Sequence, residues 1–291
     1  MYGQKLCLAT GVSSSLTEEE QIMLYKRTGF DGFFVGYGND EHIQNVAALA
    51  KRENMIFQSI HAPFGRVDKL WLEGEDGEIV LKELIDCVES AAKAGVEIVV
   101  SHVWIGFDRP EKPGALGLDR FGKLVRLAAD RGVKIAFENT EGEEFLAAIM
   151  DAFKNEKNVG FCWDTGHEQC YNMSKDMTAL YGDRLIATHI NDNLGVSDFG
   201  GHTFWLDDLH LLPFDGIIDW TDLAARLNKC GYNGYLTFEL NRNSKPNRHD
   251  NDKYGLMTDE TYVAEAYARA CRLAFIKKRL VEKNNAAKLT L

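Results

Sequence analysis

Short apolar runs recur along the chain, and stretches of helical periodicity separate them. Eight runs have the length and composition of β-strands, at residues 5–9, 31–37, 55–62, 96–103, 134–138, 159–164, 185–189 and 235–239. Strands that alternate with helices favour a parallel sheet, and a closed barrel is the leading arrangement for a chain of 291 residues. We therefore predict an α/β fold with one domain over 1–291, a single (β/α)8 TIM barrel with a C-terminal helix. An open, doubly wound sheet is the structural alternative.

The helices between these runs have readable boundaries. Apolar positions three and four residues apart predict helices at 40–54, 78–94, 120–131 and 221–229, and a long helix from 258 to about 282 that ends in a frayed tail. Gly95 and Gly132 mark two of the helix ends, and Thr221 is the predicted N-cap of a third helix. Two long connections, 64–77 and 191–216, are candidate substrate walls or lids.

Four of the predicted strands stop on a residue that can bind a metal. Side chains alternate between the faces of a strand, so each terminal residue shares its face with the residue two positions earlier. That earlier residue is small in all four strands, as expected for a face that points into a barrel. The terminal residues are Glu138, Asp164, His189 and Glu239, and the small residues are Ala136, Cys162, Ala187 and Thr237.

We predict that these four terminal side chains meet at the mouth of the barrel and bind one divalent metal. Two glutamates, one aspartate and one histidine form an oxygen-rich set, which favours Mn²⁺ and also suits Zn²⁺, Mg²⁺ or Co²⁺. An ordinary polar residue where a strand meets a loop would explain any one of the four. The repetition of the same pattern in four strands favours the metal site.

More potential ligands lie at comparable strand ends or in the loops that follow: His61, His102, His167, Asp208 and His210. A lone histidine near an apolar run is more often a hydrogen-bonded core residue than a ligand. Because five such residues converge on the same rim, we predict that they bind substrate or support the ligands, with extra metal ligation as the alternative.

Composition and charge narrow the range of partners. The formal net charge of −11 argues against a dedicated nucleic-acid surface, because phosphate binding draws on clustered lysine and arginine. The chain has no long uncharged apolar stretch and no basic, apolar leader, so no membrane partner is expected. The six cysteines form no Cys-x-x-Cys pair, which is typical of a reducing compartment. We expect a soluble, cytoplasmic protein.

Several motifs resemble those of the xylose isomerase-like (β/α)8 barrels, a superfamily that includes sugar and sugar-phosphate isomerases and epimerases, inosose dehydratase and endonuclease IV. The matching stretches span nearly the whole chain in the same order. They are Ser59-Ile60-His61-Ala62-Pro63, Phe137-Glu138-Asn139-Thr140, Trp163-Asp164-Thr165-Gly166-His167, His189-Ile190-Asn191-Asp192-Asn193, residues 208–220 and Phe238-Glu239-Leu240. These motifs specify the superfamily more sharply than they specify a substrate.

The resemblance implies a divalent-metal-dependent isomerase or epimerase that acts on a small sugar or sugar phosphate by proton transfer through an enediolate. It implies that Glu138, Asp164, His189 and Glu239 bind one metal, and that Glu138 and Glu239 also act as acid and base. His167 would then contact the substrate near the reacting oxygen. An inosose dehydratase-type lyase would use the same metal and base. The oligomeric state stays open, and a homo-oligomer is compatible with the sequence.

Endonuclease IV is the rival from another functional class. The resemblance to that family supplies counterparts for all nine of its ligands to three zinc ions, namely His61, His102, Glu138, Asp164, His167, His189, Asp208, His210 and Glu239. Against a DNA phosphodiesterase stand the acidic net charge and the stretch 139–143, which carries glutamates where the nuclease family has an uncharged, glycine-rich loop. The sequence therefore favours a sugar as the substrate.

Two further sets of residues bear on the substrate. Aromatic residues near the strand ends would stack on the C–H face of a sugar, or would pack in the core: Trp71, Trp104, Phe107 and Trp205. Four arginines are candidates to bind a phosphate group, if they are not simply solvated: Arg66, Arg109, Arg242 and Arg248. The stretch 195–205 resembles an insertion and is either an aromatic lid or a surface loop.

Overall fold

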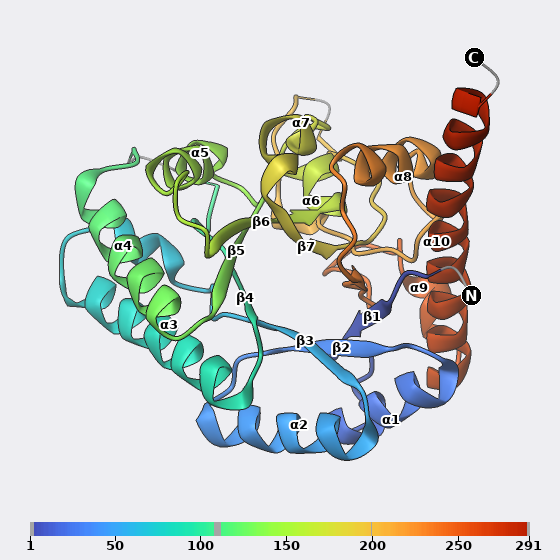
Figure 1. Ribbon diagram of the computed structural model, residues 1–291, viewed down its shortest axis with the longest axis horizontal. Helices are drawn as coiled ribbons and strands as arrows, with labels where there is room; N and C mark the ends of the chain where they lie inside the picture. Colours follow the sequence, from blue (N-terminus) through green and yellow to red (C-terminus); the bar gives the residue numbers. More distant parts are fainter. Residues whose placement is uncertain (1–2, 108–111, 199, 290–291) are drawn as a thin grey trace.

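Eight parallel strands pair side by side in the order β7-β6-β5-β4-β3-β2-β1-β8, and helices cover the outside of the resulting barrel (Figure 1). The computed structural model describes residues 3–107, 112–198 and 200–289. The strands are β1 (Leu6–Ala9), β2 (Gly32–Gly36), β3 (Ile56–His61), β4 (Ile98–Ser101), β5 (Lys134–Glu138), β6 (Val159–Asp164), β7 (Leu185–His189) and β8 (Leu236–Phe238). All eight predicted strands are present, and each strand end lies within two residues of the predicted position.

The barrel closes between β7 and β8. Ile190 forms a parallel bridge with Phe238, and the Ile190 amide donates to the Thr237 carbonyl at 2.8 Å. The Glu239 amide donates back to the Ile190 carbonyl at 3.2 Å. These bonds rule out the open, doubly wound sheet, because both edges of such a sheet would stay unpaired.

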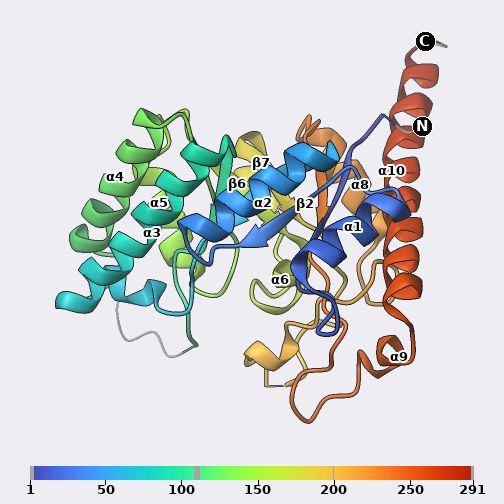
Figure 2. The same ribbon diagram turned by 90° about the horizontal axis from the view of Figure 1, so that it is seen from below.

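The helices are α1 (Glu18–Thr28), α2 (Asp40–Glu53), α3 (Glu75–Ala94), α4 (Ala115–Asp130), α5 (Glu143–Ala152), α6 (Thr165–Cys170), α7 (Met177–Tyr181), α8 (Trp220–Lys229), α9 (Asp252–Gly255) and α10 (Asp259–Leu289). All five predicted helices exist. Figure 2 shows α6 and α9 on one side of the barrel, among the connections that follow the strands. None of the helices in the described part of the chain has the length and hydropathy needed to cross a bilayer.

Several helix predictions were incomplete or wrong at their ends. The helices α1, α5, α6, α7 and α9 were not predicted, although Thr17 and Glu20 form a capping box at the start of α1. The N-cap of α8 is Asp219 and not Thr221, because the Asp219 carboxylate accepts from the Thr221 amide at 2.8 Å. The last helix continues to Leu289, beyond the predicted end near 282.

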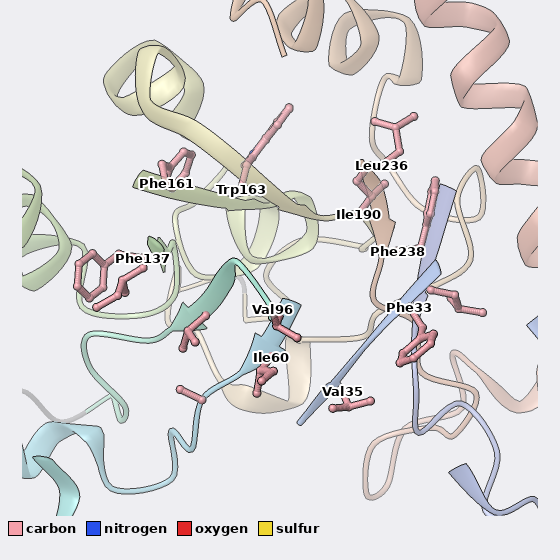
Figure 3. Close-up of a cluster of buried hydrophobic side chains, with 14 of the residues drawn as sticks. Phe33, Val35, Ile60, Val96, Phe137, Phe161, Trp163, Ile190, Leu236 and Phe238 are labelled. Atoms are coloured by element: carbon pink, nitrogen blue, oxygen red, sulfur yellow. The ribbon is translucent and has the colours of Figure 1, made fainter. Parts of the chain in front are cut away.

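The apolar core lies in two layers on either side of the strands. Large side chains such as Phe137, Phe161 and Trp163 point outward to the helices (Figure 3). A separate cluster of small or slender residues fills the inside of the barrel: Val100, Ala136, Cys162 and Ala187. Alternation along each strand therefore separates bulky outward residues from small inward ones, as predicted.

Helix α10 covers the side of the barrel where the first and last strands meet (Figure 1). The ring of Tyr267 on α10 packs edge-on against Phe30, which follows α1, with ring centroids 5.2 Å apart. The Asn228 side chain of α8 donates to the Lys277 carbonyl at 2.9 Å. The C-terminal helix is therefore joined to the helices on both sides of it.

A buried ion pair joins α6 to α8. The Arg226 guanidinium donates to both oxygens of Glu168, each at 2.7 Å, and stacks over Trp163 with 4.4 Å to the ring centroid. Glu168 is 2% exposed and also accepts from the Trp163 indole N–H at 2.9 Å. Glu168 follows His167 directly, so this pair fixes the short helix that carries a predicted site residue.

We expect Arg226→Ala to lower the free energy of unfolding by about 3 kcal/mol, because it leaves the Glu168 carboxylate buried without its cation. Denaturant titration followed by circular dichroism measures the loss. Arg279→Ala is the matched control, since Arg279 pairs with Glu282 at 3.0 Å on an exposed face. That variant should lose less than about 0.5 kcal/mol. Equal losses in the two variants would contradict a structural role for the buried pair.

Candidate functional site

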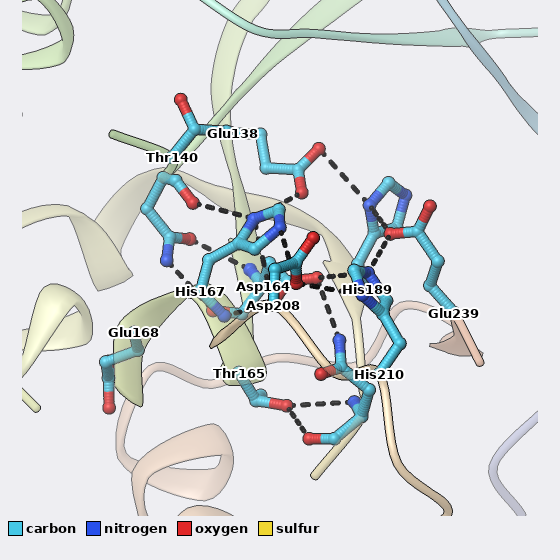
Figure 4. Close-up of polar contacts among 12 residues, drawn as sticks. Glu138, Thr140, Asp164, Thr165, His167, Glu168, His189, Asp208, His210 and Glu239 are labelled. Atoms are coloured by element: carbon cyan, nitrogen blue, oxygen red, sulfur yellow. Dashed lines mark hydrogen bonds and ion pairs between the residues drawn. The ribbon is translucent and has the colours of Figure 1, made fainter. Parts of the chain in front are cut away.

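The four predicted metal ligands lie together at the carboxyl ends of neighbouring strands (Figure 4). Glu138, Asp164 and His189 are the last residues of β5, β6 and β7, and Glu239 follows β8 directly. One ligand atom from each of the four residues lies within 4.8 Å of the others. The His189 Nδ1 atom is 3.2 Å from a Glu138 oxygen and 3.0 Å from a Glu239 oxygen.

Buried polar atoms without hydrogen bonds show that this group of residues suits a cation. Both carboxylate oxygens of Glu138 and both ring nitrogens of His189 are buried, and none has a well-aligned hydrogen bond within the described chain. A buried donor or acceptor that makes no well-aligned hydrogen bond calls for an explanation, and a bound cation would supply one. Oxygen and imidazole ligands at this spacing can surround one divalent ion, whereas a hydrogen-bonded core network would have satisfied them.

Two histidines from the two preceding strands, β3 and β4, approach Glu138. His61 is the last residue of β3, and His102 follows β4 directly. The Nε2 atoms of both rings lie 3.5 Å from the same Glu138 oxygen, Oε2. His61, His102 and Glu138 are all buried and form a second group with the spacing of metal ligands.

The remaining three predicted residues meet on the other side of the central four. The Nε2 atom of His167 lies 3.4 Å from Asp208 Oδ1, and the Nδ1 atom of His210 lies 2.9 Å from the same oxygen. His210 has a φ of 49°, a left-handed conformation that is strained for a residue other than glycine. Asp164, His167 and His210 form a third group with the spacing of metal ligands. All nine residues singled out in the sequence therefore converge, while their individual roles stay predictions.

The carboxylates and imidazoles shift each other's proton affinity. Burial alone would raise the pKa of Glu138, but His189, His102 and His167 hold it well below its ordinary value. Burial would lower the pKa of His189, but Glu138 and Glu239 raise it well above the usual range. Without metal, Glu138 therefore favours the carboxylate form and His189 the imidazolium form.

Burial and neighbouring charges act in opposite directions on the pKa values of Asp164 and His210. Burial raises the pKa of Asp164 to about 6, although His167 and His210 act against it. Burial lowers the pKa of His210, but the adjacent Asp208 carboxylate raises it to about 10. Asp164 therefore titrates close to neutral pH, where His210 keeps its proton in the absence of metal.

Three asparagines support the site and were not among the predicted residues. Asn191 donates to Asp164 Oδ2 at 2.9 Å, and Asn139 accepts from the Asp164 amide at 2.8 Å. Asn139 also donates to the Asn172 side-chain oxygen at 3.0 Å. Asn139 and Asn191 lie within the quoted motifs, next to predicted ligands, and this adjacency was the available signal. Asn172 lies outside the quoted motifs, five residues after His167, and no comparable signal marks it.

A cavity with two connected lobes opens above the site. A lobe of about 540 Å³ is lined by residues at the carboxyl ends of β1, β2 and β3 and by residues that follow β8. A lobe of about 450 Å³, called the aromatic lobe, is lined by aromatic and histidine side chains together with several charged residues. Glu239 lines both lobes, whereas Glu138 lies beneath them and is fully buried. The residues common to the two lobes are His61, Phe64, Asp208, His210, Glu239 and Lys245.

The aromatic residues named in the sequence divide between cavity and core. Phe107 and Trp205 line the aromatic lobe, so they are placed to contact a ligand. Trp104 instead stacks on Phe145 at 4.1 Å between ring centroids, and Trp71 packs against the same phenylalanine. The core alternative therefore holds for the two buried tryptophans.

Comparison with known proteins gives two kinds of likeness. An uncharacterised protein of Sinorhizobium fredii is 32% identical over 68% of this chain, and the match covers 60% of that relative. Endonuclease 4 of Thermus thermophilus is 30% identical over 53% of this chain and 59% of its own length. The crystal structure of D-psicose 3-epimerase from Clostridium cellulolyticum superposes with a TM-score of 0.72 at 16% identity, covering 94% of this chain and 99% of that chain. At that identity the epimerase shows a shared fold alone.

The family model described as xylose isomerase-like TIM barrel matches residues 22–260, which include all nine converging residues. The eight-stranded barrel and the position of the site at its strand ends are consistent with this match. The chain therefore belongs to the xylose isomerase-like TIM barrel family.

Proposed function

We propose that this protein is a divalent-metal-dependent isomerase or epimerase of a small carbohydrate, working by proton transfer through an enediolate. The observation that carries the proposal is the position of two glutamates around one histidine at the floor of the cavity. Glu138 and Glu239 both lie within 3.2 Å of His189 Nδ1. The cavity lobes of about 540 and 450 Å³ fit a small molecule and its immediate substituents.

The chain supplies ligands, proton carriers and positioning groups. Glu138, Asp164, His189 and Glu239 would hold the metal, which when bound would stabilise the negative charge that develops on a substrate oxygen. Glu239 lines the cavity, so its carboxylate is placed to take a proton from a carbon next to a carbonyl group. Glu138 is the proposed second proton carrier, and His167 is proposed to bind a substrate oxygen from the aromatic lobe.

Replacing Glu239, the proposed proton carrier, should slow the proton-transfer step without preventing substrate binding. We expect Glu239→Gln to slow hydrogen exchange at the reacting carbon by about 10²- to 10⁴-fold, because an amide cannot accept the proton. Deuterium incorporation from D₂O, followed by NMR with Mn²⁺ across aldoses, ketoses and their phosphates, measures the rate. Glu97→Gln is the matched control, because Glu97 is exposed at the amino end of β4. Exchange at the wild-type rate in Glu239→Gln would contradict the assignment.

Metal binding should release protons. In the metal-free site the raised pKa of His189 keeps its ring protonated near pH 7, and a metal needs the neutral imidazole. We therefore expect about one or more protons to leave per metal bound and the apparent affinity to rise with pH. Calorimetry at one pH in two buffers of different ionisation enthalpy measures the release. The exposed His202 makes His202→Gln a control that should behave as wild type, and an enthalpy independent of buffer would contradict the prediction.

A second candidate function rests on the three overlapping ligand groups. Glu138 belongs to the group with His61 and His102 as well as to the central four, and Asp164 belongs to the central four as well as to the group with His167. Shared carboxylates of this kind could bridge three metals, which favours a phosphodiesterase related to endonuclease IV. The Glu141 carboxylate in the aromatic lobe and the net charge of −11 oppose binding of a DNA backbone.

The two candidates differ in metal stoichiometry and in the bond that breaks. For the proposed isomerase we expect about one tightly bound metal per chain and no cleavage of abasic-site DNA with added Zn²⁺. Elemental analysis after dialysis counts the metal, and gel electrophoresis of a labelled duplex detects the strand break. Three tightly bound zinc ions together with strand cleavage would contradict the isomerase proposal and support the phosphodiesterase.

A further inference from the structure

Lys245 is a cation at the junction of the two cavity lobes. Its side chain is 17% exposed and lines both lobes, beside Glu239 and His210. No other lysine or arginine lines either lobe within the described part of the chain. This residue lies in the segment 241–251 that follows β8 and was not singled out in the sequence.

Hydrogen bonds fix the segment that carries Lys245. The Asn251 side chain donates to the Leu209 carbonyl at 3.0 Å and to the Asn241 carbonyl at 2.7 Å. The Arg248 guanidinium, three residues after Lys245, pairs with the buried Asp207 at 3.0 Å. The backbone on both sides of Lys245 is therefore tied to the loop that precedes His210.

The ammonium group itself is loosely held. Lys245 Nζ lies 3.5 Å from Asp208 Oδ2 and 5.6 Å from the centroid of the Trp205 ring. Asp208 Oδ1 is meanwhile contacted by His167 and His210. A lysine has three N–H donors, so this arrangement leaves donors of Lys245 free for a ligand in the cavity.

Other cations near the site have closer carboxylate partners, so they are less available. Among the arginines considered for phosphate binding, Arg66 pairs with Glu83 at 2.7 Å, and Arg109 lies outside the described residues. Three more cations on this segment or on α9, which follows it, pair at 3.0 Å or less: Arg242 with Asp259, Arg248 with Asp250 and Lys253 with Asp215. The contrast sets Lys245 apart within its own segment.

The charge of the cavity decides when an anion can enter. Five carboxylates line it or lie beneath it, and Lys245 offsets one of them: Glu138, Glu141, Asp164, Asp208 and Glu239. The protonated rings of His189 and His210 offset two more of these charges in the metal-free site, and a divalent metal on the central four would add positive charge beside Lys245. With metal in place, Lys245 presents a positive charge next to the reacting centre.

We propose that Lys245 binds an anionic group of the substrate, which makes the substrate a sugar phosphate or a sugar acid and not a neutral sugar. This inference rests on the proposed function and narrows its substrate class. Lys245 is a specificity-determining residue in this account, because its charge acts on binding and not on the proton transfer. A phosphate and a carboxylate offer the same oxygen chemistry to the ammonium group, and the substrate panel below distinguishes them.

The test uses the full-length, metal-loaded protein and two readouts. Calorimetry with inorganic phosphate compares wild type with Lys245→Gln and Lys245→Arg, and elemental analysis confirms equal metal content. We expect phosphate to bind about 10- to 100-fold more weakly to Lys245→Gln, with Lys245→Arg within about threefold of wild type. Lys253→Gln is the matched control, because it removes the same charge from α9, which directly follows the segment 241–251 and does not line the cavity. Chelation of the metal should weaken phosphate binding to the wild type, because it removes a positive charge beside Lys245.

Proton exchange in D₂O supplies the second readout with matched substrates. D-fructose is paired with D-fructose 6-phosphate, and D-glucose with D-glucuronate. We expect exchange in an anionic member alone, and Lys245→Gln should raise its KM about 10- to 100-fold with little change in kcat.

The outcomes separate the inference from the function on which it rests. Exchange with neutral sugars at the same efficiency would overturn the role of Lys245 and leave the isomerase standing. No exchange with any sugar, together with phosphate binding that depends on Lys245, would overturn the isomerase and keep the anion site. Phosphate binding that is absent, or equal in wild type and Lys245→Gln, would overturn the anion site.

Discussion

Glu138 is a carboxylate with no exposure to solvent, and the rest of the site depends on how its charge is balanced. Moving a carboxylate from water into a protein interior costs several kcal/mol unless cations and hydrogen bonds compensate. Histidines from four different parts of the chain lie within 3.5 Å of its two oxygens: His61, His102, His167 and His189. The strand ends of the barrel are therefore coupled, since a change at one of them alters the balance at Glu138. The same carboxylate and imidazoles are suited to a metal once the rings lose their protons.

The barrel creates this crowding by packing small residues below the site. Ala136, Cys162 and Ala187 lie inside the strands two positions before the ligands, so the terminal side chains can approach one another over a filled interior. Asparagine side chains then orient the ligands. Gly166 leaves space for the side chain of Asn191, which donates to Asp164. A Cβ atom at Gly166 would lie 1.8 Å from the Asn191 side-chain oxygen. The open side of the site faces the two-lobed cavity, and Glu239 is the carboxylate of the central four that lines it.

The sequence was sufficient for features that depend on local periodicity. The alternation of residues predicted the eight strands and the inward position of Glu138, Asp164 and His189, because a strand has only two faces. It was insufficient for α6, a short helix held by the Glu168–Arg226 pair, because no periodic pattern develops over so few residues. Lys245 and Asn172 reach the site through loop conformations, which long-range contacts determine. The sequence could not predict that Trp104 packs against Phe145, because an aromatic residue near a strand end has the same local pattern in a core as in a cavity.

The central claim is that the four strand-end residues bind one divalent metal beneath the cavity. Crystals grown with Mn²⁺ and measured for anomalous scattering test it most directly, because the signal locates the metal independently of any assay. The account predicts a strong anomalous peak enclosed by Glu138, Asp164, His189 and Glu239. A map without a peak at that position, or with metal only among His61, His102 or His210, would contradict it.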